Sequence, residues 1–133
     1  MKNSIENSDK KLIAAAKAAI VKNYDAENFN HTVGAAVACS SGEIYTGVNV
    51  YSLHGACAEQ VAIGAAITAG ERYFLKIVAV RGENGEEIIP PCGNCRQILS
   101  DYMPDCDVLL MNEDSVIKVK SKELLPYAYK VEA

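Results

Sequence analysis

Three cysteines stand where helices are expected to begin: Cys57, Cys92 and Cys95. Cys92 and Cys95 form a C-x-x-C pair, whose side chains leave one face of a helix start. The helix dipole and free backbone N–H groups lower thiol pKa values there, and thiolates are preferred zinc ligands. The pair alone also fits a redox dithiol or no function at all. A third cysteine at a second helix start favours a metal site.

Glu59 follows Cys57 by two residues at the head of the apolar stretch "HGACAEQVAIGAA", residues 54–66. An ionised carboxylate is costly in the core that such a helix normally joins. One interpretation is a first-turn glutamate stabilised by the helix dipole. The other is a general acid/base beside a zinc ion whose fourth position is open to water. A closed structural site would need a fourth ligand, for which the candidates are His31, His54, Cys39 and Cys106.

The spacing of Cys57 and Glu59 restricts where a metal can lie. Residues two apart in a regular helix point roughly 200° away from each other. Both can face one metal only if Cys57 is at the helix start and the metal lies on the helix axis, ahead of the first turn. Because three thiolates weaken zinc as a Lewis acid, backbone N–H groups and a cation should compensate. Arg96 is the available cation, or else an ordinary solvated arginine.

Apolar periodicity and turn residues predict the elements that must hold these groups. The first helix is expected over 8–24, with Ser8 as its cap. The second is expected to begin at Cys57 and to end at Gly70, which suits the C′ position. The third is expected to begin at the prolines at 90–91 and to end before Pro104. Strands are expected on both sides of a turn at 40–42 within 31–50, and over 75–82, 106–112 and 115–121, the last at a sheet edge. A Gly- and Glu-rich loop follows residue 82, and a final helical turn covers 122–125.

This order of elements predicts a three-layer α/β/α sandwich, with helices on both faces of a mixed five-stranded sheet. The length of 133 residues predicts one domain over residues 1–133. The second and third helices each follow a strand, so their N-termini can meet at one end of the sheet. That arrangement would bring the three cysteines together.

Composition sets the broad class of protein. Half of the residues are hydrophobic and 23% are charged, as in globular proteins. No apolar run approaches the ~20 residues of a membrane span, and a net charge of −4 argues against a nucleic-acid binder. The polar N-terminus lacks the apolar segment of a signal peptide, so a cytoplasmic location is expected. Five cysteines are an odd number for a disulfide framework, and Cys39 and Cys106 are expected to be buried core thiols.

The motif C-A-E at residues 57–59, with P-C-G-N-C-R-Q placing its first cysteine 35 residues after Cys57, resembles the zinc-dependent cytidine deaminase superfamily. The resemblance covers essentially the whole chain. It implies a cytidine deaminase-like fold and one zinc ion per chain, bound by Cys57, Cys92 and Cys95. It also implies that Glu59 takes a proton from the water at zinc, which attacks C4 of a cytosine ring, and delivers protons to ring N3 and the departing amine.

The same resemblance extends to the substrate pocket and the assembly. It implies that the Ala58 amide and the Pro91 carbonyl contact the base. It further implies a homotetramer in which neighbouring subunits complete one another's active sites.

Three positions differ from the nucleoside-specific members, which typically carry N-x-E in the second strand, Phe before V-G-A and Arg after C-A-E. Here Asn49 is retained but Tyr51 replaces the glutamate. His31 stands in place of the phenylalanine, and Gln60 in place of the arginine. The lost carboxylate was an acceptor for a sugar hydroxyl, a contact of about 1–3 kcal/mol, so cytidine and deoxycytidine should be recognised less well.

The stretches T-G-V-N-V-Y and E-L-L-P-Y-A-Y instead resemble the blasticidin S deaminase branch of the superfamily, which acts on a cytosine nucleoside antibiotic. By this resemblance Thr32, Asn49, Tyr51 and Tyr129 are candidate substrate contacts. A core or subunit-interface role is the alternative for both tyrosines. The sequence departs from that branch at Val131, where an aromatic residue is expected, and in the loop before the cysteine pair, which lacks an arginine. Arg81 is a nearby residue that could supply this cation instead.

Three hypotheses follow. The first is a zinc-dependent hydrolytic deaminase of a cytosine nucleoside, either blasticidin S or a related analogue, or else cytidine and deoxycytidine in pyrimidine salvage. The second is a structural zinc protein, and the third is a dithiol redox protein. The structural and redox hypotheses leave Glu59 unexplained, and the redox hypothesis also leaves Cys57 without a role. The deaminase is therefore preferred.

Overall fold

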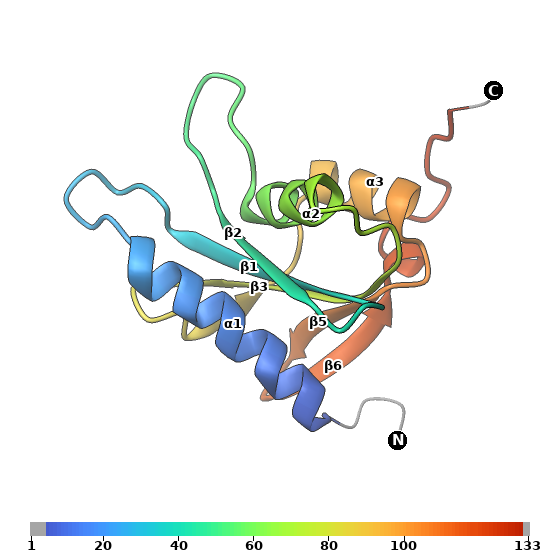
Figure 1. The fold of residues 1–133 in the computed structure, drawn as a ribbon, viewed down its shortest axis with the longest axis horizontal. Helices are drawn as coiled ribbons and strands as arrows, with labels where there is room; N and C mark the ends of the chain where they lie inside the picture. The colour runs from blue at the N-terminus through green and yellow to red at the C-terminus, as the bar shows by residue number, and fades with distance from the viewer. Residues whose placement is uncertain (1–4, 132–133) are drawn as a thin grey trace.

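Strand β3 (Phe74–Arg81) lies at the centre of the sheet, and its residues 77–80 are buried. A computed structural model describes residues 5–131 (Figure 1). The other strands are β1 (Val33–Cys39), β2 (Ile44–Val48), β4 (Glu87–Ile89), β5 (Asp107–Asn112) and β6 (Ser115–Lys120). The helices are α1 (Asn7–Asn23), α2 (Ala58–Thr68), α3 (Gly93–Tyr102) and the 3₁₀ turn η1 (Ser121–Leu124).

The sheet is mixed and runs in the order β2-β1-β3-β5-β6, with β4 paired to β3 off this path. Only β3 and β5 are parallel, and the other pairs are antiparallel. The predicted mixed sheet is confirmed, but it has six strands rather than five. The additional strand β4 lies in the segment that was expected to be a loop. It has only three residues, too few to show an alternating pattern, and it pairs with residues 79–81 of β3, which β5 does not reach.

Helices cover both faces of the sheet, as predicted (Figure 1). Alternate residues of the strands point to opposite faces. Ala35, Val37 and Ile77 pack in the cluster beneath α2 and α3, whereas Ala36 and Val78 pack beneath α1. None of the helices formed by residues 5–131 combines the length and the apolar composition that a membrane span needs.

Helix α1 begins differently from the prediction. Its N-cap is Glu6 rather than Ser8, and the Asp9 carboxylate accepts a hydrogen bond from the Glu6 backbone N–H at 2.8 Å. Asp9 is fully buried and lies 2.6 Å from the Lys76 ammonium and 3.0 Å from that of Lys118. These long-range ion pairs hold Asp9 against the sheet, and so the helix starts where Asp9 can cap it.

Helix α2 packs directly on the backbone of β2. A Cβ atom at Gly47 would lie 2.6 Å from the Ala62 nitrogen and 2.9 Å from the Ala58 carbonyl oxygen. Only glycine allows this approach, which places the start of α2 over the sheet. The helix ends as predicted, with Gly70 in the left-handed region at φ 101° after the C-cap Ala69.

Cys39 and Cys106 are core residues, each 1% exposed, as predicted. Burial raises the pKa of Cys39 to about 11 and that of Cys106 to about 12. Both thiols are therefore protonated and chemically inert at neutral pH.

Candidate active site and metal centre

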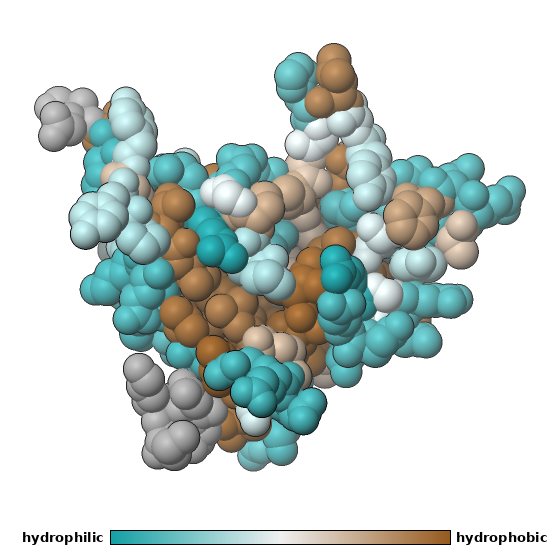
Figure 2. All heavy atoms as spheres, turned by 180° about the vertical axis from the view of Figure 1, so that it is seen from behind, coloured by the Kyte–Doolittle hydropathy of each residue, from teal (hydrophilic) through white to brown (hydrophobic). Residues whose placement is uncertain are grey.

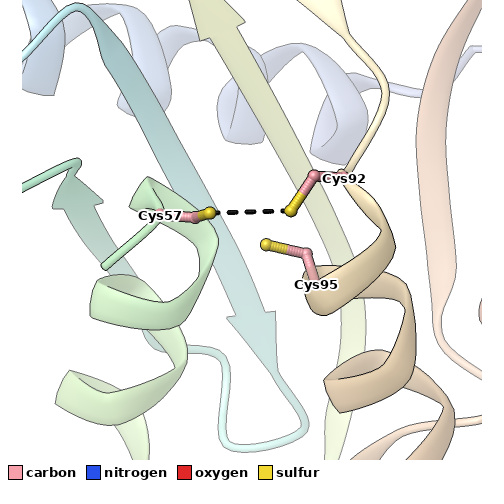
Figure 3. A group of neighbouring side chains, drawn as sticks. All are labelled: Cys57, Cys92 and Cys95. Atoms are coloured by element: carbon pink, nitrogen blue, oxygen red, sulfur yellow. Dashed lines mark hydrogen bonds between the residues drawn. The ribbon is translucent and has the colours of Figure 1, made fainter. Parts of the chain in front are cut away.

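The Sγ atoms of Cys57, Cys92 and Cys95 lie within 4.8 Å of one another. Cys57 comes from the start of α2, and the other two come from the start of α3 (Figure 3). The Sγ atoms of Cys57 and Cys92 are 3.6 Å apart. The structure thus confirms that two helix starts bring the three cysteines together. Cys57 directly precedes the first helical residue, which the spacing to Glu59 required.

Local sequence explains how both helix starts are held. The Gln60 side-chain oxygen accepts a hydrogen bond from the Cys57 backbone N–H at 3.0 Å, which satisfies a group at the beginning of α2. At α3, strand β4 leads into two prolines, whose fixed φ angles suit the extended approach to a helix start. Cys92 then caps α3, and Cys95 lies one turn later on the same side.

The electrostatic environment of the thiols differs from one to the next. Burial works to raise the pKa of Cys92, but the backbone N–H groups of Cys95 and Asn94 stabilise its thiolate and bring its pKa below the ordinary value. Burial and the neighbouring Cys92 raise the pKa of Cys57. Burial and the Glu59 carboxylate raise the pKa of Cys95 strongly. Such a group of crowded acidic donors fits a divalent cation, which would relieve their mutual repulsion.

The metal-ligand set contains only three residues within the part of the chain that the structure describes. None of the four candidates for a fourth ligand belongs to it. Cys39 and Cys106 are in the core, and His54 is exposed in the segment between β2 and α2. A set of three protein ligands leaves one tetrahedral position open, which is characteristic of catalytic zinc.

Glu59 lies in the first turn of α2 and is 5% exposed. Burial raises the pKa of its carboxyl group, opposed by hydrogen bonds from its own backbone N–H and from Cys95. Its side chain lines an open cavity of about 390 Å³ together with Cys57 and Cys92. It also borders a much smaller void of about 10 Å³ in the apolar core. A carboxyl group so placed, between apolar core and cavity, is suited to proton transfer.

The large cavity is lined mainly by apolar surface. Three of the predicted contacts line it: Asn49, Tyr51 and Ala58. The other lining residues outside the metal centre are Val33, Val50, Ser52, Gly55, Ala56, Ile89 and Pro90. Glu59 is the only carboxylate among the lining residues that the structure describes.

The three remaining predicted contacts do not line this cavity. Thr32 is half-buried next to Val33, which does line it. Pro91 is buried and borders the small void beside Glu59. Tyr129 is exposed on the C-terminal segment, where its backbone carbonyl accepts a hydrogen bond from Gln97 of α3.

The arginines considered for charge compensation make other contacts. Arg96 donates through Nε to the Pro91 carbonyl at 2.8 Å and through Nη1 to the Leu124 carbonyl at 3.3 Å. Arg81 forms an exposed ion pair with Glu87. Compensation for the Cys92 thiolate comes instead from backbone N–H groups at the start of α3.

Comparison with known proteins shows the family to which this chain belongs. The family model described as the cytidine and deoxycytidylate deaminase zinc-binding region matches residues 6–109. This chain belongs to the cytidine and deoxycytidylate deaminase family. It is 37% identical to a blasticidin-S deaminase of Bacillus cereus, over 95% of each chain. It is 34% identical to a cytidine deaminase of Sporosarcina psychrophila, over 92% of this chain and 91% of that one.

Solved structures of cytidine deaminases share the fold. The enzyme of Burkholderia pseudomallei is 34% identical with a TM-score of 0.76, covering 94% of this chain and 100% of that one. The enzyme of Mycobacterium tuberculosis is 25% identical with a TM-score of 0.75, covering 95% and 100%. The chain is a member of this deaminase family, and its three clustered cysteines are positioned to bind a metal ion. It is therefore a zinc-dependent hydrolytic deaminase.

Most residues of the apolar cavity wall could not be predicted from the sequence. Val33, Val50 and Ile89 carry no chemical signal, because an aliphatic residue that lines a pocket looks like any core residue. Ile89 is brought there by strand β4, which the sequence pattern did not predict.

Proposed function

We propose that this enzyme deaminates blasticidin S or a related cytosine nucleoside. The observation that carries this proposal is a single cavity that joins Glu59 and two of the cysteines to Asn49 and Tyr51. With Tyr51 in the lining, the described cavity wall offers no carboxylate besides Glu59 that could accept a ribose hydroxyl. That composition suits a sugar without the ordinary hydroxyl pattern. The similarity to the Bacillus cereus blasticidin-S deaminase over nearly the whole chain supports the same substrate.

In the proposed mechanism, zinc held by Cys57, Cys92 and Cys95 would supply the Lewis acidity that makes water a nucleophile at neutral pH. Glu59 takes one proton from the water that adds to C4 of the cytosine ring and delivers it to N3. It then passes the second water proton to the exocyclic amine. The C4–N bond breaks, ammonia leaves and a 4-oxo group remains. Burial of Glu59 favours its protonated form, which such a carrier must reach during turnover.

Six residues are proposed to hold the substrate: Thr32, Asn49, Tyr51, Ala58, Pro91 and Tyr129. The Ala58 amide and the Pro91 carbonyl would contact the base. The Pro91 carbonyl already accepts a hydrogen bond from the Arg96 guanidinium, so the base would use its second lone pair. Asn49 and Tyr51 would contact the sugar part, from the segment between β2 and α2.

The second candidate function is the deamination of cytidine and deoxycytidine in pyrimidine salvage. Its support is the similarity to the cytidine deaminases of Sporosarcina psychrophila and Burkholderia pseudomallei. The structural zinc hypothesis is weaker, since the described ligand set has three members and faces a cavity. The redox hypothesis is also weaker, because it leaves both Cys57 and Glu59, which lie beside the cysteine pair, without a role.

The deciding experiment compares cytidine, deoxycytidine and blasticidin S side by side, following the absorbance change on deamination. We expect kcat/KM to be highest for blasticidin S. Cytidine turnover far above that of blasticidin S would instead assign the enzyme to pyrimidine salvage. If no cytosine compound is deaminated and zinc removal unfolds the chain, the structural hypothesis would be correct.

We further propose that the enzyme is a homotetramer. Large apolar side chains are exposed on the C-terminal segment and on the segment that projects between β2 and α2 (Figure 1): Tyr127, Tyr129, Val131 and Leu53. Apolar side chains also gather across the centre of the face opposite the view of Figure 1 (Figure 2). Exposed apolar surface of this kind supports burial between subunits. Light scattering on a gel-filtration column should give the mass of four chains, and a monomer would contradict the proposal.

We also propose that the chain is one domain that works in the cytoplasm. Among the described residues, α2 and α3 share one core cluster with the sheet, and α1 shares the other. All three proposed ligands must remain reduced thiols, which a reducing compartment ensures.

A further inference from the structure

His31 connects two segments that are distant in the sequence. Its Nδ1 atom lies 2.8 Å from the backbone carbonyl oxygen of Asn49, eighteen residues away. A carbonyl oxygen can only accept a hydrogen bond, so the Nδ1 atom of His31 must carry the hydrogen. This contact links the loop before β1 to the residue that follows β2.

Asn49 is held at three of its four polar groups. Its backbone N–H donates to the Val33 carbonyl at 3.3 Å, and its side-chain oxygen accepts the Val33 N–H at 3.0 Å. Its own carbonyl accepts the hydrogen bond from His31. Among residues 5–131, no partner is found for the amide nitrogen Nδ2 of Asn49. Since Asn49 lines the cavity that contains Glu59, this nitrogen is the donor that remains for a substrate.

The backbone at His31 has an unfavourable conformation, which the surrounding contacts must stabilise. Its φ angle of 54° is in the left-handed region, which few residues other than glycine adopt. Phe29 has the same φ angle, and the loop is closed by a bridge between Asp25 and Asn30. The Asp25 carboxylate also accepts hydrogen bonds from Asn28 at 3.0 and 2.9 Å. These contacts hold the loop in one conformation and so fix the position of the His31 imidazole.

We propose that His31 is a positioning residue for substrate selection: its Nδ1–H holds the Asn49 carbonyl and so directs the free Asn49 amide at a hydrogen-bond acceptor on the sugar part of the substrate. This inference rests on the proposed function, in which Asn49 contacts that part. The role requires a hydrogen-bond donor at the δ position and does not require an aromatic ring.

A matched pair of variants separates the donor from the packing of the side chain. In His31→Asn, the side-chain amide N–H is separated from Cα by the same number of bonds as Nδ1 of histidine. Asparagine also adopts the left-handed backbone conformation readily. Aspartate in His31→Asp has nearly the same shape and the same tolerance, but it places an acceptor against the Asn49 carbonyl. We expect kcat/KM of His31→Asn to stay within about threefold of wild type, and that of His31→Asp to fall roughly tenfold through KM.

A third variant tests the aromatic ring by itself. His31→Phe keeps a ring but removes the donor, and Phe29 shows that phenylalanine can adopt this backbone conformation. We expect it to lose kcat/KM as His31→Asp does. Wild-type kinetics in His31→Phe, or an equal loss in His31→Asn and His31→Asp, would overturn the inference.

A measurement on the unchanged protein does not depend on the folding of any variant. The chain has two histidines, His31 and His54, and a His54→Gln variant assigns their signals. Nitrogen-15 spectra of the zinc-loaded enzyme at about pH 8.5, above the ordinary imidazole pKa of about 6.5, report the neutral tautomer. We expect hydrogen on Nδ1 of His31. Hydrogen on Nε2 with a bare Nδ1 would overturn the inference.

The proposed function and the role of His31 are overturned by different results. Wild-type enzyme that deaminates no cytosine nucleoside would overturn the proposed function, and the role of His31 in selection with it. Wild-type activity that His31→Asp leaves unchanged would overturn the role of His31 alone.

Discussion

Glu59 is a carboxyl group that the fold keeps buried among thiols at the wall of a cavity. Its position in the first turn of α2 gives it favourable interactions with the helix N-terminus, whereas burial disfavours its charge. A titratable group buried beside a candidate metal centre is well placed for proton transfer.

Replacing Glu59 with glutamine should remove the proposed proton carrier and leave the shape of the site intact. We expect kcat to fall by about 10²–10⁴ in Glu59→Gln, since the amide cannot accept the proton from water. Zinc should remain at one ion per chain, because the three cysteines are unchanged. Metal analysis and steady-state kinetics on the same preparation check both expectations.

An exposed glutamate supplies the control for Glu59→Gln. Glu83→Gln removes the same charge in an exposed loop and should keep wild-type kcat. Loss of zinc from Glu59→Gln would mean that Glu59 supports the metal instead, and normal turnover would remove it from the mechanism.

At the scale of elements, the active site depends on where two helices start. Helix α2 is placed by its close contact with β2 at Gly47, and α3 is placed by β4 and the prolines that follow it. Arg96 and Gln97 of α3 then hold the backbone of the C-terminal segment through the carbonyls of Leu124 and Tyr129. A shift in any of these elements would move a metal ligand or the segment that carries Tyr129.

Two glycine substitutions test how α2 is placed. In Gly47→Ala the new methyl group would meet the Ala62 nitrogen at 2.6 Å, so we expect a loss of about 1–3 kcal/mol of stability and weaker zinc binding. In Gly64→Ala, on the exposed side of the same helix, no atom lies within 4 Å of the new Cβ. That variant should gain about 0.5–1 kcal/mol from helix propensity.

Urea unfolding measures both changes in stability, and chelator competition measures the retention of zinc. If Gly47→Ala binds zinc as tightly as Gly64→Ala, the packing of β2 on α2 does not control the metal centre.

At the scale of the whole molecule, Asp9 ties the first helix to strands from the middle and the end of the chain. Its buried carboxylate pairs with Lys76 of β3 and Lys118 of β6, and Glu6 lies 3.7 and 3.6 Å from the same ammonium groups. Burial works to raise the pKa of Asp9, but hydrogen bonds from both lysines outweigh it and leave the pKa below its ordinary value of 3.8. Removing one member of such a group leaves buried charge without compensation.

Asp9→Asn should therefore destabilise the protein by about 3 kcal/mol at neutral pH. Because the folded protein lowers the pKa of Asp9, the ionised group stabilises the fold above the ordinary pKa of 3.8. This contribution is lost as the pH falls through the lower pKa of the folded state. The difference in unfolding free energy between wild type and Asp9→Asn should thus be constant from pH 7 to about 5 and shrink below pH 4. Urea unfolding at several pH values measures it.

The control is Asp105→Asn, which removes an exposed partner of Lys122. Exposed ion pairs contribute little, so no measurable change is expected. A gap between wild type and Asp9→Asn that persists unchanged at pH 3 would show that packing, rather than charge, explains the loss.

Much of the molecule follows from local spacing in the sequence. The C-A-E and P-C-G-N-C patterns predicted the ligands, both helix starts and the place of Glu59, because a helix converts short spacings directly into directions in space. The order of the elements predicted a mixed sheet with helices on both faces, and the small apolar character of free cysteine predicted two buried core thiols. Each of these features depends on residues a few positions apart.

Only the tertiary structure decided the features that join distant segments. The three-residue strand β4 exists because β3 extends beyond β5 and needs a partner. The N-cap of α1 is Glu6 rather than Ser8, because two lysines from β3 and β6 hold the Asp9 carboxylate where it accepts the Glu6 backbone N–H. His31 can hold Asn49 only because β1 and β2 pair in one register, which brings residues eighteen positions apart into contact. The sequence by itself determined the chemistry of the metal centre, whereas sheet register decided which polar groups remain free to meet a substrate, because register depends on contacts summed over the whole fold.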